Sequence, residues 1–173
     1  MSDATAPHDG EIRRQSKIFS DVLMVAAVLM AVMLAFNVGW PLARALRGAL
    51  EGEPWRVAVK EVGLNLIGAL PAVLLLLGVF AAQRVFARMS EGAIFTRANA
   101  VDIGRIGENM LWAAIAAVVI SPTLAGFVRG DRDLSIDLGD WVLLLGVLGV
   151  AVGLMGRVLG LATQIKAEND QIV

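Results

Sequence analysis

Four long apolar runs, separated by three polar intervals, constrain the fold of this 173-residue chain more than any other feature of its sequence. They cover about residues 22–40, 62–82, 110–128 and 141–163. An α-helix rises about 1.5 Å per residue, so about 20 apolar residues cross a hydrocarbon core roughly 30 Å thick. Hydrophobic residues make up 57% of the chain, above the roughly 45–50% of a soluble domain. The sequence therefore predicts an all-α, polytopic membrane protein in the lipid bilayer, with four transmembrane helices as two hairpins joined by a cytoplasmic amphipathic loop-helix.

The composition leaves few side chains for chemistry. There is no cysteine or tyrosine, and the only histidine, His8, lies in the polar N-terminal segment. The sequence contains no acid pair, nucleophile–base pair, metal-binding cluster or phosphate-binding loop. The net charge of −1 gives no overall positive field that would attract nucleic acid. We therefore expect a protein that is not an enzyme, with no catalytic residue, cofactor, metal or direct nucleic acid binding.

The polar segments divide the chain into a tail, a membrane domain and a second tail. Residues 1–21 predict a polar N-terminal tail, residues 22–163 the four-helix membrane domain, and residues 164–173 a C-terminal tail. A cleaved signal peptide is the alternative for the first run, because Ala43 and Ala45 are small, although that run exceeds the usual roughly 7–15 residues. Between the first two runs, the spacing of Ala43, Leu46 and Leu50 predicts a short interfacial helix.

The distribution of lysine and arginine favours one orientation in the membrane. With both termini in the cytoplasm, nine of the 15 basic residues lie in cytoplasmic segments and six on the opposite side. Cytoplasmic segments of membrane proteins carry an excess of basic residues, so both the N and C termini are predicted to be cytoplasmic. The tryptophans agree, since all four would lie near a membrane interface, where the indole ring is favoured.

A stripe of glycines runs along the fourth apolar run. It consists of Gly139, Gly146, Gly149, Gly153, Gly156 and Gly160. Their spacing places them on one narrow helix face, and pairs within the stripe fit the GxxxG pattern of closely packed membrane helices. One interpretation is packing within the chain, against a small-residue face of the third helix formed by Ala113, Ala116, Ala117 and Ser121. A seam between two chains in a homodimer is the alternative.

Few polar groups interrupt the apolar runs, and no acidic residue lies inside any of them. Asn37 and Asn65 are predicted to make interhelical hydrogen bonds, because a buried amide needs a partner. Pro71 removes a backbone hydrogen bond, which a neighbouring helix can replace, and so predicts a packed kink. Arg157 lies near the inner boundary, where it can extend to the interface or pair with Glu108.

The longest polar interval, residues 88–109, predicts a turn and then the polar start of the third helix. Gly92 permits the turn, and Thr96 is suited to cap a helix that begins near Arg97. Phe95, just before the cap, can pack back on the first helical turn. From Arg97 onward, an apolar stripe and polar pairs predict a cytoplasmic extension of about three turns. This extension is either a solvated connector at the membrane surface or a docking surface for a cytoplasmic partner.

Two short motifs resemble a known family. The first is the run Gly92-x-x-Phe95-Thr96-x-x-Asn99-Ala100 followed by Ile106-Gly107, which resembles the inter-hairpin motif of a bacterial four-helix membrane family, the domain of unknown function 2975. The tail from Ala167 to Val173 is similar to the acidic and then β-branched ending of that family, with Gln171 as a departure. The resemblance covers nearly the whole chain, from the first span to Val173. It implies an integral inner-membrane protein without an assigned activity, often encoded beside a small helix-turn-helix regulator.

The sequence supports two hypotheses of function from different classes. The first is a non-enzymatic interaction or regulatory protein of the bacterial inner membrane, which engages a cytoplasmic partner, such as a small helix-turn-helix regulator, through residues 88–109 and the C-terminal tail. Its partner-docking candidates are Gly92, Phe95, Thr96, Asn99, Arg105 and Glu168. The alternative is a small transporter or channel-forming oligomer, motivated by the prolines and asparagines of the apolar runs and by the glycine stripe.

Overall fold

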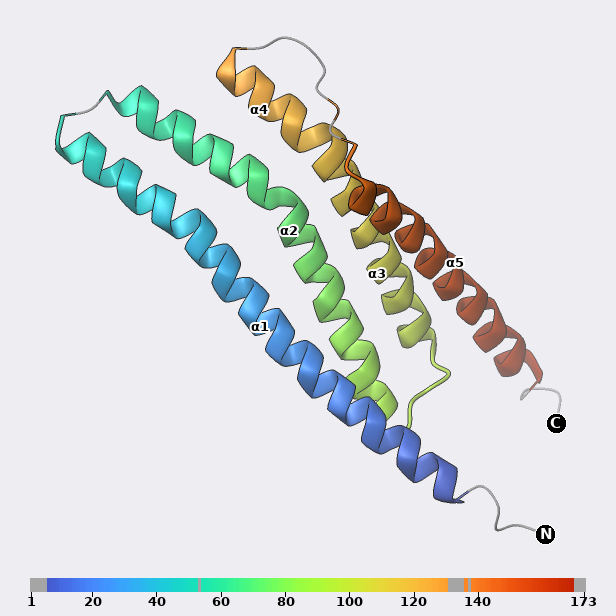
Figure 1. The fold of residues 1–173 in the computed structure, drawn as a ribbon. Helices are drawn as coiled ribbons and strands as arrows, with labels where there is room; N and C mark the ends of the chain where they lie inside the picture. The colour runs from blue at the N-terminus through green and yellow to red at the C-terminus, as the bar shows by residue number, and fades with distance from the viewer. Residues whose placement is uncertain (1–5, 53, 131–135, 137, 170–173) are drawn as a thin grey trace.

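The computed structural model describes residues 6–52, 54–130, 136 and 138–169. Its helices are α1 (Ala6–Leu50), α2 (Trp55–Ser90), α3 (Arg97–Ile115), the short π-helix η1 (Ala116–Ile120), α4 (Ser121–Arg129) and α5 (Asp140–Asn169) (Figure 1). All regular structure in these ranges is helical, and α3, η1 and α4 follow one another without a break. The described chain therefore has four helices that are long and apolar enough to cross a membrane, which confirms the predicted all-α fold.

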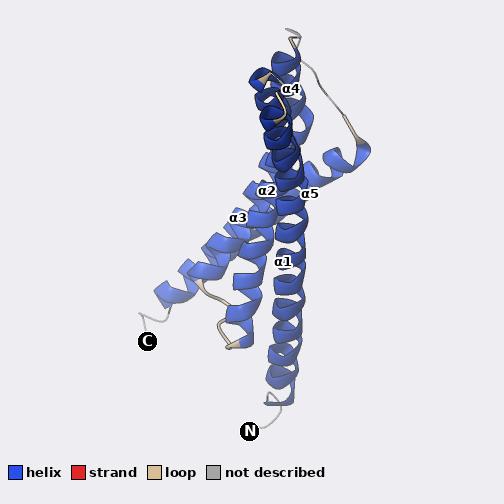
Figure 2. Cartoon of the chain, turned by 90° about the vertical axis from the view of Figure 1, so that its left-hand side faces the viewer, coloured by secondary structure: helices blue, strands red, loops and turns tan. Residues whose placement is uncertain are grey.

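The four long helices lie in an open row rather than a closed bundle. α1 packs on α2, α2 packs on α3 and α4, and α3 packs on α5 (Figures 1 and 2). The start of α1, the α2–α3 connection and the end of α5 lie at one end of the molecule, which we call the terminal end. The turn between α1 and α2 and the end of α4 lie at the opposite end.

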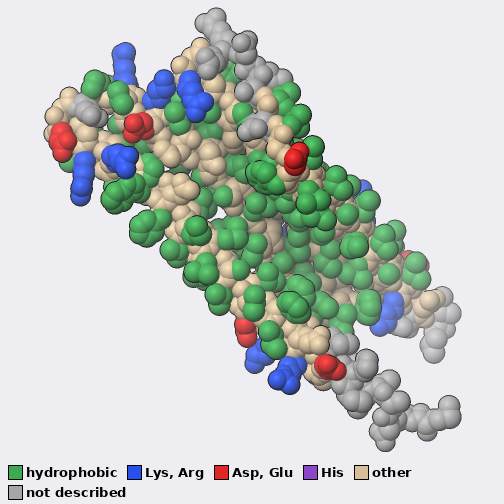
Figure 3. All heavy atoms as spheres, in the orientation of Figure 1, with side chains coloured by type: hydrophobic (Ala, Val, Ile, Leu, Met, Phe, Trp, Pro, Cys, Tyr) green, Lys and Arg blue, Asp and Glu red, His purple; other side chains and the backbone are tan. Residues whose placement is uncertain are grey.

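The surface of the helices is apolar between the two ends of the molecule. On the face shown in Figure 3, hydrophobic side chains cover the middle and most charged side chains lie toward the ends. Large side chains such as Met33, Phe36 and Met155 are strongly exposed. In water such a surface would be unfavourable, whereas lipid tails are as apolar as these side chains. The chain is therefore a multi-pass membrane protein.

α1 extends beyond the predicted first span at both of its ends. It begins at Ala6, so residues 6–21, predicted as a tail, are helical. Ser16 and Ser20 are buried there, and Gln83 Nε2 of α2 donates to Ser20 Oγ at 3.4 Å. At the other end α1 continues through Pro41 to Leu50, so the short interfacial helix predicted after Pro41 is instead the last part of α1. A proline removes a single backbone hydrogen bond, and the remaining bonds carry the helix past it.

α2 bends in its middle, near Pro71 (Figure 1). Proline has no N–H, so the carbonyl of Ile67, four residues earlier, lacks its usual partner within the helix. Ser121 Oγ of α4 donates to that carbonyl at 2.9 Å. Ser121 directly follows η1, and the next residue, Pro122, has no N–H to donate within its own helix. The hydrogen bond to Ile67 therefore joins this irregular segment to the irregular segment of α2 at Pro71. The predicted compensation of Pro71 by a neighbouring helix is confirmed.

The two membrane asparagines do not form the interhelical hydrogen bonds that the sequence predicted. Asn65 Nδ2 donates to the carbonyl of Glu61 at 2.9 Å, one turn back in the same helix. Asn37 is exposed and makes no hydrogen bond to the part of the chain that the structure describes. The exposed position of Asn37 in the open row explains its missing partner, whereas Asn65 is satisfied within its own helix.

The glycine stripe of α5 packs within the chain, against α3. A Cβ added at Gly149 would lie 2.8 Å from the backbone N of Leu111, and one added at Gly156 would lie 2.5 Å from the N of Gly104. These backbones approach so closely that only glycine fits at both positions. The stripe therefore meets α3 along most of its length, from Ala100 to Ala114. The α3 atoms nearest the added Cβ atoms belong to Ala100, Gly104, Gly107, Met110, Leu111 and Ala114 rather than to the predicted face of Ala113, Ala116, Ala117 and Ser121. Ser121 instead donates to a carbonyl of α2.

Candidate functional site at the terminal end

The connection between α2 and α3 is a short loop held in a fixed shape. Gly92 has φ +89°, a conformation that favours glycine. A Cβ added there would lie 2.7 Å from Nη2 of Arg13, because α1 passes close to this turn. Thr96 Oγ1 accepts a hydrogen bond from the N–H of Asn99 at 3.2 Å, which confirms the predicted helix cap at the start of α3.

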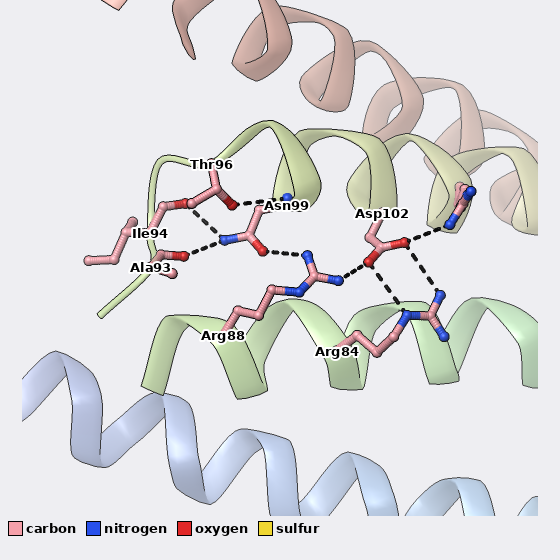
Figure 4. A network of polar contacts seen from close by, with 8 residues as sticks. Arg84, Arg88, Ala93, Ile94, Thr96, Asn99 and Asp102 are labelled. Carbon is pink, nitrogen blue, oxygen red and sulfur yellow. Dashed lines mark hydrogen bonds and ion pairs between the residues drawn. The ribbon is translucent and has the colours of Figure 1, made fainter. Parts of the chain in front are cut away.

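Asn99 joins this loop to both neighbouring helices. Its side chain is 1% exposed, and Nδ2 donates to the carbonyls of Ala93 at 2.6 Å and Ile94 at 3.0 Å (Figure 4). Its Oδ1 accepts from Nη1 of Arg88 on α2 at 2.9 Å. A single amide thus satisfies two loop carbonyls and one guanidinium. If the amide were turned over, its oxygen would face the two carbonyls and its NH₂ group would face the guanidinium, so only one orientation makes all three bonds.

Asp102, one turn further along α3, is the centre of a charged cluster and is 3% exposed. Its Oδ1 lies 3.3 Å from Nη2 of Arg84 and 3.2 Å from Nη1 of Arg105, and Nε of Arg84 donates to Oδ2 at 3.5 Å. Arg88 also donates to Oδ2 (Figure 4). We call Arg84, Arg88, Asn99, Asp102 and Arg105 the polar clamp, because it ties α2 to α3. Three guanidiniums share one carboxylate, so the clamp retains an excess positive charge.

The polar clamp is built for holding helices together. Every buried side-chain nitrogen or oxygen in the described residues has a hydrogen-bond partner, so no buried group of the clamp is left to bind a ligand. No group of three or more histidine, cysteine or acidic side chains in the described ranges could hold a metal ion. The chemistry of the clamp is therefore charge-assisted hydrogen bonding between helices.

The predicted docking residues separate into two groups in the structure. Gly92 shapes the loop through its backbone conformation, and Thr96 and Asn99 shape it through hydrogen bonds, whereas Phe95 is 67% exposed. Phe95 keeps most of its surface exposed and lines a groove together with Ala100 and Val101 of the first turns of α3. Arg105 combines an internal contact with exposure, since its side chain pairs with Asp102 and remains 60% exposed.

A groove with a volume of about 1300 Å³ runs between α3 and α5 at the terminal end. Phe95 and Arg105 line it from the α3 side, and Thr163 and Gln164 line it from α5. Gln164 Nε2 also donates to Glu168 Oε1 at 3.3 Å, one turn further along α5. The two segments predicted to dock a partner, 88–109 and the C-terminal segment, are thus neighbours in space, although residues 170–173 lie outside the described residues.

Arg157 and Glu108 line the same groove without forming the predicted ion pair. The ion pairs among the described residues all involve Asp102. Sequence reasoning missed Arg84, Arg88 and the burial of Asp102. The sequence feature that could have indicated this cluster is the i, i+4 spacing of Arg84 and Arg88, which puts both residues on one face of α2.

Comparison with known protein families assigns the chain to one of them. The family described as "Protein of unknown function (DUF2975)" matches residues 37–173, about four-fifths of the sequence. The chain belongs to this family. The DUF2975 match contains the polar clamp, the loop with Phe95 and the groove, and it begins near the end of the first apolar run rather than at its start. No curated protein and no solved structure matches the chain.

Proposed function

We propose that this DUF2975 member is a non-enzymatic interaction protein of the bacterial inner membrane, which holds a cytoplasmic protein partner at the terminal end. The observation that carries the proposal is Phe95, a large aromatic side chain that is 67% exposed on a loop fixed by Asn99. Rigid, exposed aromatic residues are the usual anchors of protein interfaces, because they bury a large area at little cost in conformational entropy.

The surroundings of Phe95 indicate the chemistry of the partner. Arg97 lies two residues from Phe95, and Gln164 lines the same groove from α5. Arg97 has no acidic partner among the described residues, since all ion pairs there involve Asp102. A partner segment with an apolar side chain for Phe95 and a carboxylate for Arg97 would suit this surface. The partner class that the family resemblance implies, a small helix-turn-helix regulator, is the first to test.

The test compares the full-length protein with two matched phenylalanine variants. Affinity purification from solubilised membranes, with quantitative mass spectrometry, should recover a cytoplasmic protein with the native chain. Phe95→Ala should reduce its recovery at least roughly tenfold, because removal of an anchor residue weakens binding by about 2 kcal/mol or more. Phe127→Ala is the control, because Phe127 is 59% exposed on α4, away from the terminal end. Glu168→Ala tests the contribution of α5.

A purified partner then makes the test quantitative. Its dissociation constant for the detergent-solubilised chain should rise with Phe95→Ala and remain unchanged with Phe127→Ala. If every recovered protein is retained equally by both variants, the proposed docking role of this loop is wrong.

A further inference from the structure

The groove between α3 and α5 continues past the docking surface into a wholly apolar trough. Its inner part is lined by Leu111, Val150 and Leu154, and these three residues also line a second hollow of about 610 Å³. That second hollow runs on between η1 and the first turns of α5, and its lining is apolar throughout. The two hollows form one path, polar near the terminal end and apolar further into the membrane-spanning part.

The polar part of this path carries an excess of positive charge. Arg97, Arg105 and Arg157 line it, against the single acidic residue Glu108. Arg105 and Arg157 each follow a glycine, and those glycines, Gly104 and Gly156, lie at one of the close approaches of the two backbones. The two arginines therefore lie at the same level of neighbouring helices, and both line the groove. Arg157 has no ion pair with the described residues, so its guanidinium is available to an anion.

We propose that this path binds one anionic glycerophospholipid, with its phosphate between Arg105 and Arg157 and an acyl chain in the apolar trough. Guanidinium groups bind phosphate through paired hydrogen bonds, and basic pockets between membrane helices suit anionic head groups. The trough below matches an acyl chain, which needs no hydrogen bonds. A zwitterionic lipid would add a second positive charge beside the arginines, and a free phosphate would leave the trough without an occupant.

The lipid site and the docking surface depend on different residues. Docking rests on Phe95 at the mouth of the groove, whereas the lipid site rests on Arg157 and on the open space beside Gly153. A Cβ added at Gly153 meets no atom within 4 Å, and Gly153 lines the groove, so we expect a larger side chain there to fill part of the groove. Either proposal can therefore fail while the other holds.

Native mass spectrometry of the full-length protein, released from a neutral detergent, tests the proposal with phosphatidylglycerol and phosphatidylcholine as probes. The native chain should retain one phosphatidylglycerol and bind phosphatidylcholine much more weakly. Arg157→Gln removes a charged hydrogen-bond donor and should weaken phosphatidylglycerol binding roughly tenfold or more. Gly153→Leu should weaken it similarly by filling the groove, and Arg157→Lys should restore most of the binding that Arg157→Gln loses.

Arg44→Gln is the matched control, because Arg44 is an exposed arginine of α1 toward the opposite end of the molecule. It should leave lipid binding unchanged. Inorganic phosphate in large excess should not displace the lipid. The proposal is overturned if phosphatidylcholine binds as tightly as phosphatidylglycerol, if phosphate alone displaces the lipid, or if Arg157→Gln and Gly153→Leu both bind like the native chain.

Discussion

Asn99 fixes a loop that has no regular structure of its own. The amide donates two hydrogen bonds to the carbonyls of Ala93 and Ile94 and accepts one from Arg88. A carboxylate of nearly the same size could still accept from Arg88, yet it could not donate to either carbonyl. The two loop carbonyls would then face a negative oxygen instead of an N–H donor.

Asn99→Asp is therefore expected to destabilise the protein despite its conservative shape. The expected loss in the free energy of unfolding is about 1–3 kcal/mol, because buried polar groups lose their partners. Thermal unfolding in detergent measures it, and hydrogen exchange at Ile94 should become faster. Asn169→Asp, at an exposed position near the end of α5, is the control and should change neither quantity. An Asn99→Asp protein as stable as the native chain would contradict the role assigned to the amide.

Local residue chemistry predicted part of this site and missed the rest. Thr96 could be predicted as a cap because a capping hydroxyl oxygen and the N–H that donates to it lie only three residues apart. The burial of Asp102 could not, because it depends on Arg84 and Arg88, on another helix. Which face of α3 turns toward α2 is set by packing of whole helices, and the amphipathic pattern of α3 alone does not specify it.

Ser121 and Pro71 form a pair across two helices. The proline frees the carbonyl of Ile67, and the serine hydroxyl occupies it. The two residues are 50 positions apart in the sequence, so the pairing follows from the way α4 lies on α2. The irregularity at Pro71 of α2 is thus tolerated because α4 supplies the missing donor.

A double-mutant cycle should reveal this coupling. Ser121→Ala should lower stability by about 0.6 kcal/mol, and by no more than about 1.7 kcal/mol, the range for hydrogen bonds between membrane helices. In a Pro71→Ala background the same change should have little effect, because the N–H of the new alanine can donate to Ile67. Thr163→Ala is a suitable control, since Thr163 donates to Gly160 within its own helix. Equal losses for Ser121→Ala in both backgrounds would show that the two sites are independent.

The glycines of α5 are not equivalent, and alanine substitutions should separate them. Gly156→Ala places a Cβ 2.5 Å from the backbone of Gly104, so α5 must move away from α3. We expect it to lose about 1–3 kcal/mol, the usual effect of overpacking. Gly153→Ala meets open space and should be neutral or stabilising by up to about 1 kcal/mol, because alanine favours the helix. Thermal unfolding of the two single variants distinguishes them, and similar losses for both would contradict this packing.

The helices themselves were largely predictable, although their bounds were not. Length and hydrophobicity identify a membrane helix, so all four apolar runs fall inside described helices. Both ends of α1 lie outside the apolar run. Near its start Ser16 and Ser20 are buried, and Gln83 of α2 donates to Ser20, so contacts with a neighbour support the helix there. Sequence composition shows which segments are stable in lipid. It does not show where a helix continues beyond such a segment because of contacts with a neighbouring helix.

For the whole molecule, the open row of helices places both described chain ends at the terminal end (Figure 1). An even number of membrane crossings requires this arrangement. The basic residues of the polar clamp also lie at this end, which accords with a cytoplasmic terminal end in our proposal.

Reporter fusions test this orientation. Alkaline phosphatase, which folds in the periplasm, should be inactive after Val173 and active when inserted after Gly52, in the turn between α1 and α2. A green fluorescent protein at the same two positions should give the reverse pattern. Phosphatase activity at Val173 would mean that the terminal end faces the periplasm and that the proposed cytoplasmic partner is wrong.

The polar clamp has a consequence for how the chain is synthesised. Arg84 and Arg88 leave the ribosome before Asp102, the carboxylate that both arginines later share. During that interval the first hairpin carries two uncompensated positive charges at the end of α2. Such charges hold a newly inserted hairpin in one orientation during insertion. When Asp102 emerges, the same two arginines are drawn into contact with α3. We therefore expect them to act first on the topology of the nascent chain and afterwards on the association of its two halves.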